Sequence, residues 1–165
     1  IRDRVYSPPR LTEVSAEFGL SPRWALDLTQ VDPDDGEPWD FNNPNNVGNT
    51  RRIIQGTKPL LLVGSPMCAA FSRLQHLNFS KMTEEDVRIV VEYGTKHLEF
   101  CMELYQVQID NGLYFLHEHP QKARSWKLNC VQETLGLRGV QTVVAHMCMF
   151  VFSFCQKYRS SEIIP

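Results

Sequence analysis

The sequence lacks a strong excess of charge, a secretion signal and any long hydrophobic run. It has 17 lysine and arginine residues against 19 aspartate and glutamate residues, which gives a formal net charge of -2. DNA-binding domains are usually basic, so any contact with nucleic acid must depend on a local patch. No stretch approaches the roughly 18 apolar residues of a membrane span, and no basic leader precedes an apolar segment.

Closely spaced cysteines are also missing. The five cysteines include no Cys-x-x-Cys pair, which argues against a zinc ribbon or a thioredoxin-like site. An odd number of cysteines without a secretion signal indicates reduced thiols, so we predict an intracellular protein with no membrane attachment. Most of these cysteines are expected to pack in the core.

What remains is the composition of an ordinary folded domain. Hydrophobic residues make up 42% of the 165 residues and charged residues 22%. This length suits one domain with a single core. We expect that domain to cover residues 1–150, and residues 151–165 to form a tail of unrelated or truncated sequence.

Short apolar runs alternate with helical patterns along the chain. Residues 30–49, rich in proline, aspartate and asparagine, are expected to form one long polar loop. The alternation predicts an α/β fold with a doubly wound, mostly parallel sheet. The expected strands are 4–6, 24–28, 59–64 (buried on both faces), 113–118 and 140–147, and the expected helices are 12–18, 50–55 (the end of a helix broken at Gly56), 83–112 and 126–135.

Chemistry in such a sheet is expected at the carboxyl ends of its strands, where ligands bind. That edge would collect residues 7–9, Asp27, Cys68 and Glu118. Cys68 follows a predicted strand and precedes a short helical pattern, a position that activates thiols as nucleophiles. A thiol and a carboxylate at one edge form a candidate pair of nucleophile and acid. The alternative is that Cys68 only packs and Glu118 is a solvated or capping acid.

Two segments resemble motifs of the cytosine-5 DNA methyltransferases. Residues 64–72 (GSPMCAAFS) are similar to the Pro-Cys motif of that family, and residues 115–120 (FLHEHP) are similar to its Glu-Asn-Val motif. One long helical pattern separates the two, as in the family. The resemblance extends over about residues 5–149, and it implies a Rossmann-like methyltransferase fold, here a partial one, in a nuclear protein if the source is eukaryotic.

The resemblance implies roles for four residues of these motifs. Cys68 would add to carbon 6 of a cytosine flipped out of DNA, and Glu118 would bind ring nitrogen 3. Ser65 and Pro66 would shape the loop of the nucleophile. The implied reaction is methyl transfer to carbon 5 of the cytosine.

The implied methyl donor is S-adenosylmethionine. Asp27 would contact its ribose and Asp40 its adenine, with Trp39 and Phe41 beside Asp40. The glycine-rich motif that cradles the donor in the family is absent, and residues 7–10 (SPPR) occupy its place with two prolines that lack amide donors. The alternative is a degenerate domain without cofactor that serves as a nucleic-acid or protein interaction module in a mobile-element protein.

DNA is the implied partner. Arg73 and Gln75 follow the nucleophile loop, where family members contact the base or the backbone. Lys122 and Arg124 could bind phosphates while Trp126 stacks on a base, although a solvated loop explains them as well. Other segments of a larger polypeptide are also expected as partners, because the chain has no room for a target-recognition domain.

Two further hypotheses involve His117 and His119, which alternate along a predicted strand and so share one side. With Cys68 or His146 they could hold a metal ion, but no typical ligand spacing supports this, and no metal is predicted. Cys68 could instead pair with either histidine in a thiol hydrolase, although no oxyanion-hole sequence is evident.

Overall fold

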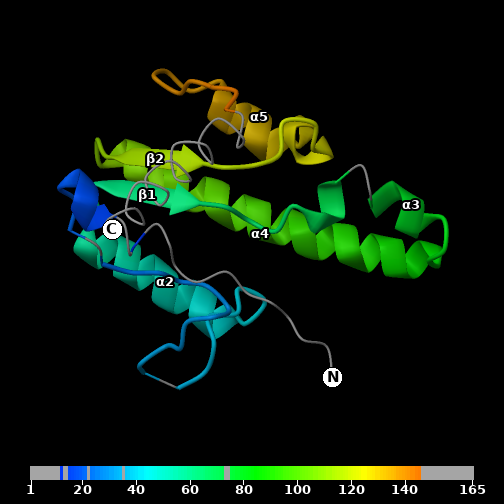
Figure 1. The fold of residues 1–165 in the computed structure, drawn as a ribbon, viewed down its shortest axis with the longest axis horizontal. Helices are drawn as coiled ribbons and strands as arrows, with labels where there is room; N and C mark the ends of the chain where they lie inside the picture. Colours follow the sequence, from blue (N-terminus) through cyan, green and yellow to red (C-terminus); the bar gives the residue numbers. More distant parts are fainter. Residues whose placement is uncertain (1–11, 13–14, 22, 35, 73–74, 146–165) are drawn as a thin grey trace, which may run out of the picture.

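A small parallel sheet packs against helices in the computed structural model, which describes residues 12, 15–21, 23–34, 36–72 and 75–145 (Figure 1). Strands β1 (Leu61–Gly64) and β2 (Tyr114–His117) pair in parallel, with Leu61 opposite Tyr114 and Gly64 opposite His117. Helix α4 (Glu84–Asp110) connects them. The predicted α/β class and the parallel pairing of these two strands are therefore confirmed.

The sheet is smaller than the sequence indicated. The described residues contain a two-stranded sheet, and no Rossmann fold is identified. The strand predicted at 24–28 is wrong: its backbone is irregular and runs into a turn in which Asp27 accepts a hydrogen bond from the Thr29 amide. Of the strand predicted at 140–147, residues 140–145 form no strand and Val143 is 82% exposed, while residues 146 and 147 lie outside the described residues. The strand predicted at 4–6 lies outside the described residues.

Helix α4 confirms the helix predicted at 83–112. Thr83 caps its first turn by accepting a hydrogen bond from the Asp86 amide, and three acidic residues there favour the positive end of the helix dipole. Gly112 ends the helix region with a positive φ of 67°. The buried residues Leu98, Met102 and Tyr105 recur at helical spacing along one face.

Helix α2 (Pro44–Thr57) corrects the predicted extent of the polar loop. The helix begins inside the segment 30–49, because Asn43 caps it by accepting from the Asn45 amide and Pro44 occupies the first turn. Gly56 does not break the helix. Helix α2 ends one residue after Gly56, at Thr57, and Lys58 adopts a left-handed conformation with φ of 43°.

The remaining elements are short. The predicted helix 126–135 divides into the 3-10 turn η3 (Arg124–Lys127) and helix α5 (Asn129–Leu135). Of the predicted helix 12–18, the structure describes mainly the 3-10 turn η1 (Ser15–Phe18). Turn η2 (Ala69–Phe71) and helix α3 (Gln75–Phe79) follow β1.

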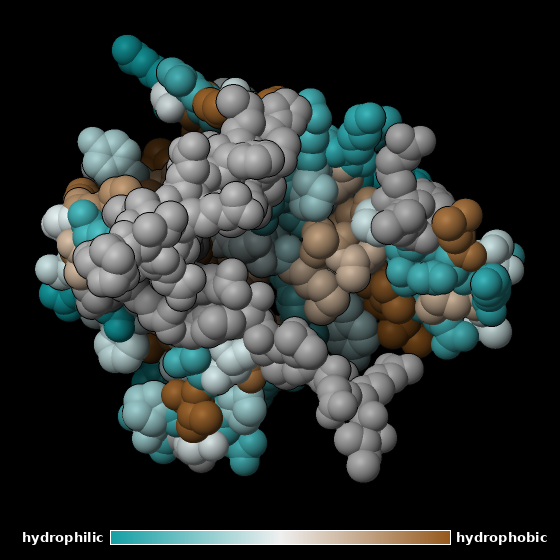
Figure 2. All heavy atoms as spheres, in the orientation of Figure 1, coloured by the Kyte–Doolittle hydropathy of each residue, from teal (hydrophilic) through white to brown (hydrophobic). Residues whose placement is uncertain are grey.

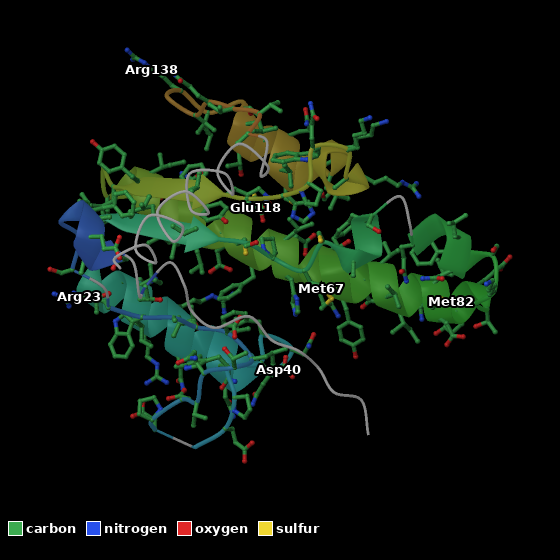
Figure 3. The ribbon with its side chains drawn as sticks, in the orientation of Figure 1. Arg23, Asp40, Met67, Met82, Glu118 and Arg138 are labelled. Carbon is green, nitrogen blue, oxygen red and sulfur yellow. The ribbon has the colours of Figure 1, made fainter. Side chains whose placement is uncertain are left out.

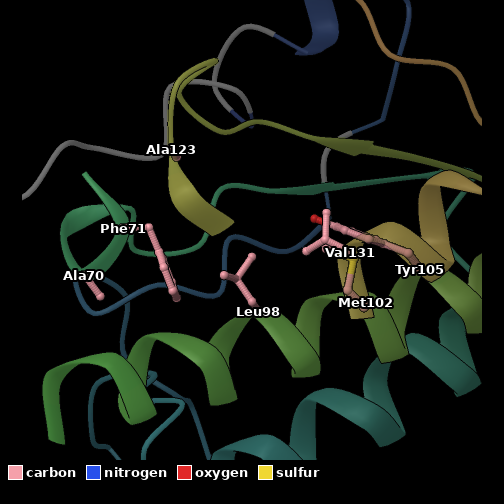
Figure 4. Close-up of a cluster of buried hydrophobic side chains, with 7 residues drawn as sticks. All are labelled: Ala70, Phe71, Leu98, Met102, Tyr105, Ala123 and Val131. Atoms are coloured by element: carbon pink, nitrogen blue, oxygen red, sulfur yellow. The ribbon is translucent and has the colours of Figure 1, made fainter. Parts of the chain in front are cut away.

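Two hydrophobic clusters lie along α4. The first joins α4 to η2, η3 and α5 (Figure 4) and contains Ala70, Phe71, Leu98, Met102, Tyr105, Ala123 and Val131. The second joins α4 to α2 through Ile54, Phe100 and Leu104. An exposed ion pair between Arg51 and Glu103, 2.6 Å long, also links α2 to α4. Helix α4 is thus the centre of the packing.

Among the described residues, helix α4 and the elements packed on it cover one face of the sheet. Leu62 and Phe115 pack on the clusters, and the Phe115 ring stacks on Tyr105 with 4.5 Å between centroids. On the opposite face, which we call the outer face, Leu61, Tyr114 and Leu116 are 40%, 65% and 54% exposed. The predicted burial of β1 on both faces is therefore wrong.

Hydrophobic side chains also reach the surface elsewhere. Figure 2 shows them among hydrophilic ones at the end of the molecule formed by α3 and the start of α4, where Leu77 and Ile89 are exposed. Within the described part of the chain, no helix is both long enough and apolar enough to cross a membrane.

Candidate functional site

The two motif loops meet at the carboxyl edge of the sheet. Because Gly64 and His117 are register partners, the residues that follow them lie side by side. The Glu118 amide donates to the Gly64 carbonyl at 2.9 Å, and the Ser65 hydroxyl donates to Glu118 Oε2 at 2.7 Å. Figure 3 shows Glu118 just beyond β2 and Met67 in the loop after β1.

Ser65 and Glu118 continue the outer face of the sheet, since successive side chains of a strand alternate between faces. Both residues are exposed. Among the described residues, no other side chain forms a hydrogen bond with the Glu118 carboxylate. The carboxylate therefore has one oxygen held by Ser65 and is open to a ligand.

Cys68 lies at the start of turn η2 and is half-buried. Its carbonyl accepts a hydrogen bond from the Phe71 amide at 3.0 Å. Pro66, also half-buried, and the exposed Met67 connect it to Ser65. No hydrogen bond joins Cys68 to Glu118. The structure thus brings Ser65 into direct contact with Glu118 and places Cys68 in the adjoining turn.

Gly94 of α4 determines where this turn sits. Ala70 and Phe71 are 5% and 4% exposed, and a Cβ atom added at Gly94 would lie 2.7 Å from the Cβ of Ala70. Sequence reasoning missed this contact. The signal was available, because a glycine inside a strong helical pattern often marks a close approach.

Replacing Gly94 by alanine is expected to push η2, and Cys68 with it, away from α4. Overpacking of this kind costs about 1–2 kcal/mol of unfolding free energy, measured by urea denaturation. Gly48→Ala is the matched control, because nothing lies within 4 Å of a Cβ atom added there and Gly48 also sits in a helix. If Gly94→Ala is as stable as Gly48→Ala, which gains the same helix propensity without a clash, the turn is not seated on α4.

A ring cluster lies on the other side of the strand end, on the face toward α4. The Tyr105 hydroxyl and His117 Nδ1 share a hydrogen bond of 3.1 Å. The rings of His117 and His119 stack with 5.5 Å between centroids and 10° between planes. Trp126 meets both rings nearly at right angles and donates from Nε1 to the Pro120 carbonyl at 2.8 Å.

The imidazoles in this cluster are neutral at pH 7. His119 is 8% exposed, and neither of its buried ring nitrogens makes a hydrogen bond. Burial lowers the pKa of His117 to about 4, with a further lowering from His119 and an opposing effect of Glu118. Burial also lowers the pKa of His119. If His119 became an imidazolium, both of its N–H groups would be buried without a hydrogen-bond partner.

The residues assigned to S-adenosylmethionine have partners within their own segments or pack in the core. Asp27 Oδ1 already accepts from the amide and the hydroxyl of Thr29, and Asp40 Oδ1 accepts from the amide and the side chain of Asn42. Trp39 is 3% exposed and belongs to the core.

Phe41 completes the set assigned to the methyl donor, and it also has a packing role. Its ring packs on Phe100, with 5.4 Å between centroids. Figure 3 shows Asp40 on the α2 side of the molecule. Residues 7–10, which replace the glycine-rich motif, lie outside the described residues.

The residues assigned to DNA are dispersed along the chain. Arg73 lies outside the described residues. Gln75 begins α3, and its Oε1 accepts a hydrogen bond from Asn78. Lys122 and Arg124 are exposed in the segment after β2. Trp126 packs against the two histidines, with its ring nearly at right angles to both.

The metal and hydrolase hypotheses find no geometric support. The described histidine, cysteine, aspartate and glutamate residues include no group of three or more that could hold a metal ion, and His146 lies outside them. No hydrogen bond joins Cys68 to His117 or His119, and His117 is instead bonded to Tyr105.

Comparison with known proteins gives no match. No family model fits the chain, and no curated protein and no solved structure matches it.

Proposed function

We propose that this chain binds a cytosine of DNA at the carboxyl edge of its sheet and adds Cys68 to the base, as the resemblance to cytosine-5 methyltransferases implies. The observation that supports this most is the hydrogen bond between Ser65 and Glu118. It joins the two segments that carry the resemblance, across 53 residues of sequence, at the sheet edge where ligands bind in parallel folds.

The proposed chemistry needs only residues of this chain and solvent. The Cys68 thiolate forms a bond to carbon 6, and the electron pair of the 5,6 double bond moves to carbon 5 while a proton between Glu118 and ring nitrogen 3 joins the two by a hydrogen bond. Carbon 5 then takes a proton from water. Loss of the original carbon 5 proton to water restores the double bond and expels the thiolate. The net result is exchange of the carbon 5 hydrogen with solvent.

Methyl transfer is the second form of this proposal, and the residues assigned to the methyl donor do not support it. Asp27 and Asp40 use their carboxylates in local turns, and Trp39 is buried. These observations favour the form of the proposal that uses no methyl donor. Calorimetric titration of the chain with S-adenosylmethionine separates the two forms: we expect no binding heat, and saturable heat would favour the active methyltransferase.

Exchange at carbon 5 tests the proposed site directly. A single-stranded oligonucleotide containing cytosine is incubated with the protein in D₂O, and the carbon 5 proton signal is followed by NMR. The wild type should remove this signal, Cys68→Ser should not, and Glu118→Gln should slow the loss by about tenfold or more.

The matched control is Cys130→Ser, which alters another half-buried cysteine, in helix α5. This variant should exchange at the wild-type rate. Exchange that persists in Cys68→Ser, or that is absent from the wild type, would contradict the proposed function.

A further inference from the structure

The Ser65 side chain is hydrogen-bonded to the Glu118 side chain. A separate backbone hydrogen bond joins the loop after β1 to the loop after β2. The hydroxyl donates to Oε2 at 2.7 Å, and the Glu118 amide donates to the Gly64 carbonyl at 2.9 Å. Removing the hydroxyl would therefore release the carboxylate without removing the bond that holds the strand end.

An exposed glutamate samples many rotamers, and fixing it in one costs conformational entropy. Glu118 is exposed and has no other hydrogen-bonding side chain among the described residues. The Ser65 bond occupies Oε2, and it leaves Oε1 for a ligand on the outer face. A carboxylate with one oxygen fixed in this way is oriented before the ligand arrives.

We infer that Ser65 is a positioning residue that orients Glu118 toward ring nitrogen 3 of the bound cytosine. This inference rests on the proposed function. It assigns Ser65 a specific task beyond shaping the nucleophile loop. The residue acts through Glu118 and touches no reacting atom.

Two variants and a control separate positioning from a merely structural bond. Ser65→Ala removes the hydroxyl, and Ser65→Thr retains it. Ser80→Ala is the control, because Ser80 is also exposed and its hydroxyl donates to a nearby carbonyl, that of Leu77.

The first measurement needs no activity. Three-bond coupling constants of the Glu118 methylene protons, measured by NMR, should indicate one rotamer in the wild type and in Ser65→Thr. They should be averaged in Ser65→Ala and unchanged in Ser80→Ala. A single Glu118 rotamer in Ser65→Ala would overturn the inference.

The second measurement is carbon 5 exchange at saturating oligonucleotide. Ser65→Ala should be slower by about tenfold, as expected for loss of one hydrogen bond to a charged group, and Ser65→Thr should recover most of the rate. If the wild type exchanges and Ser65→Ala matches it, the inference fails while the proposed function stands. If the wild type does not exchange, the proposed function fails, and the coupling constants alone decide whether Ser65 holds Glu118.

Discussion

Replacing Gly64 by alanine is expected to lower the free energy of unfolding by about 3 kcal/mol, near the upper end for overpacking of a core. A Cβ atom at this position would lie 2.0 Å from the Tyr105 hydroxyl oxygen and 3.0 Å from its Cζ. Tyr105 cannot easily move away, since it is 1% exposed, stacked on Phe115 and bonded to His117. Urea denaturation followed by circular dichroism measures the loss.

A double-mutant cycle tests the cause of this loss. Tyr105→Phe removes the oxygen that the new methyl group would meet, so the Gly64→Ala change should cost at least about 1 kcal/mol less in that background. Gly56→Ala is a matched control in α2, with nothing within 4 Å of a Cβ atom added there, and it should stabilise the helix by about 0.5–1 kcal/mol. Additive effects of the two substitutions would show that Tyr105 does not fill the space at Gly64.

Acid is expected to destabilise the protein as the pH falls below about 6.5. The folded-state pKa of His117 is about 4, below the 6.5 of an unperturbed histidine. Below pH 6.5 the unfolded chain therefore binds more protons than the folded one, so stability falls as the pH falls from about 6.5 toward 4. His117 alone should account for about 3 kcal/mol over this range, and His119 adds to the loss in the same direction.

Urea denaturation at pH 7, 5.5 and 4.5 measures this effect. His119→Phe retains a stacked ring and removes the two buried nitrogens without partners, so its stability should fall less with acid and should not be lower at pH 7. His97→Gln is the comparison, since His97 lies apart from the ring cluster and bonds to Asn42. In His97→Gln, the part of the acid-induced loss of stability that comes from His117 and His119 should remain. A flat profile between pH 7 and 4.5 in the wild type would contradict the buried, neutral state of the histidines.

The parts of the fold that the sequence predicted well have strong local signals. Strands β1 and β2 are apolar runs with clear ends, and α4 combines a threonine cap, acidic residues in its first turn and a long apolar repeat. Their parallel pairing follows from the helical crossover between them. That pairing also placed the segments after Gly64 and His117 at one edge, which is why the contact of Ser65 with Glu118 was within reach of sequence reasoning.

The parts that were missed depend on packing between distant segments. The run Trp24–Leu28 has the composition of a strand, but no partner strand pairs with it among the described residues. The spacing of His117 and His119 predicted a shared side, yet it could not reveal that Tyr105 and Trp126 fill that side. Likewise, the sequence does not show which side chains approach Gly64 and Gly94.

Two residues on one face of helix α4, Gly94 and Tyr105, position the loop after β1, and their spacing limits how this sequence can change in evolution. Gly94, which seats the turn of Cys68, and Tyr105, which fills the space at Gly64, are separated by about three helical turns. Many substitutions between them preserve that spacing. An inserted or deleted residue would rotate one contact by about 100° relative to the other. The length of this interval is therefore under a stricter constraint than its composition.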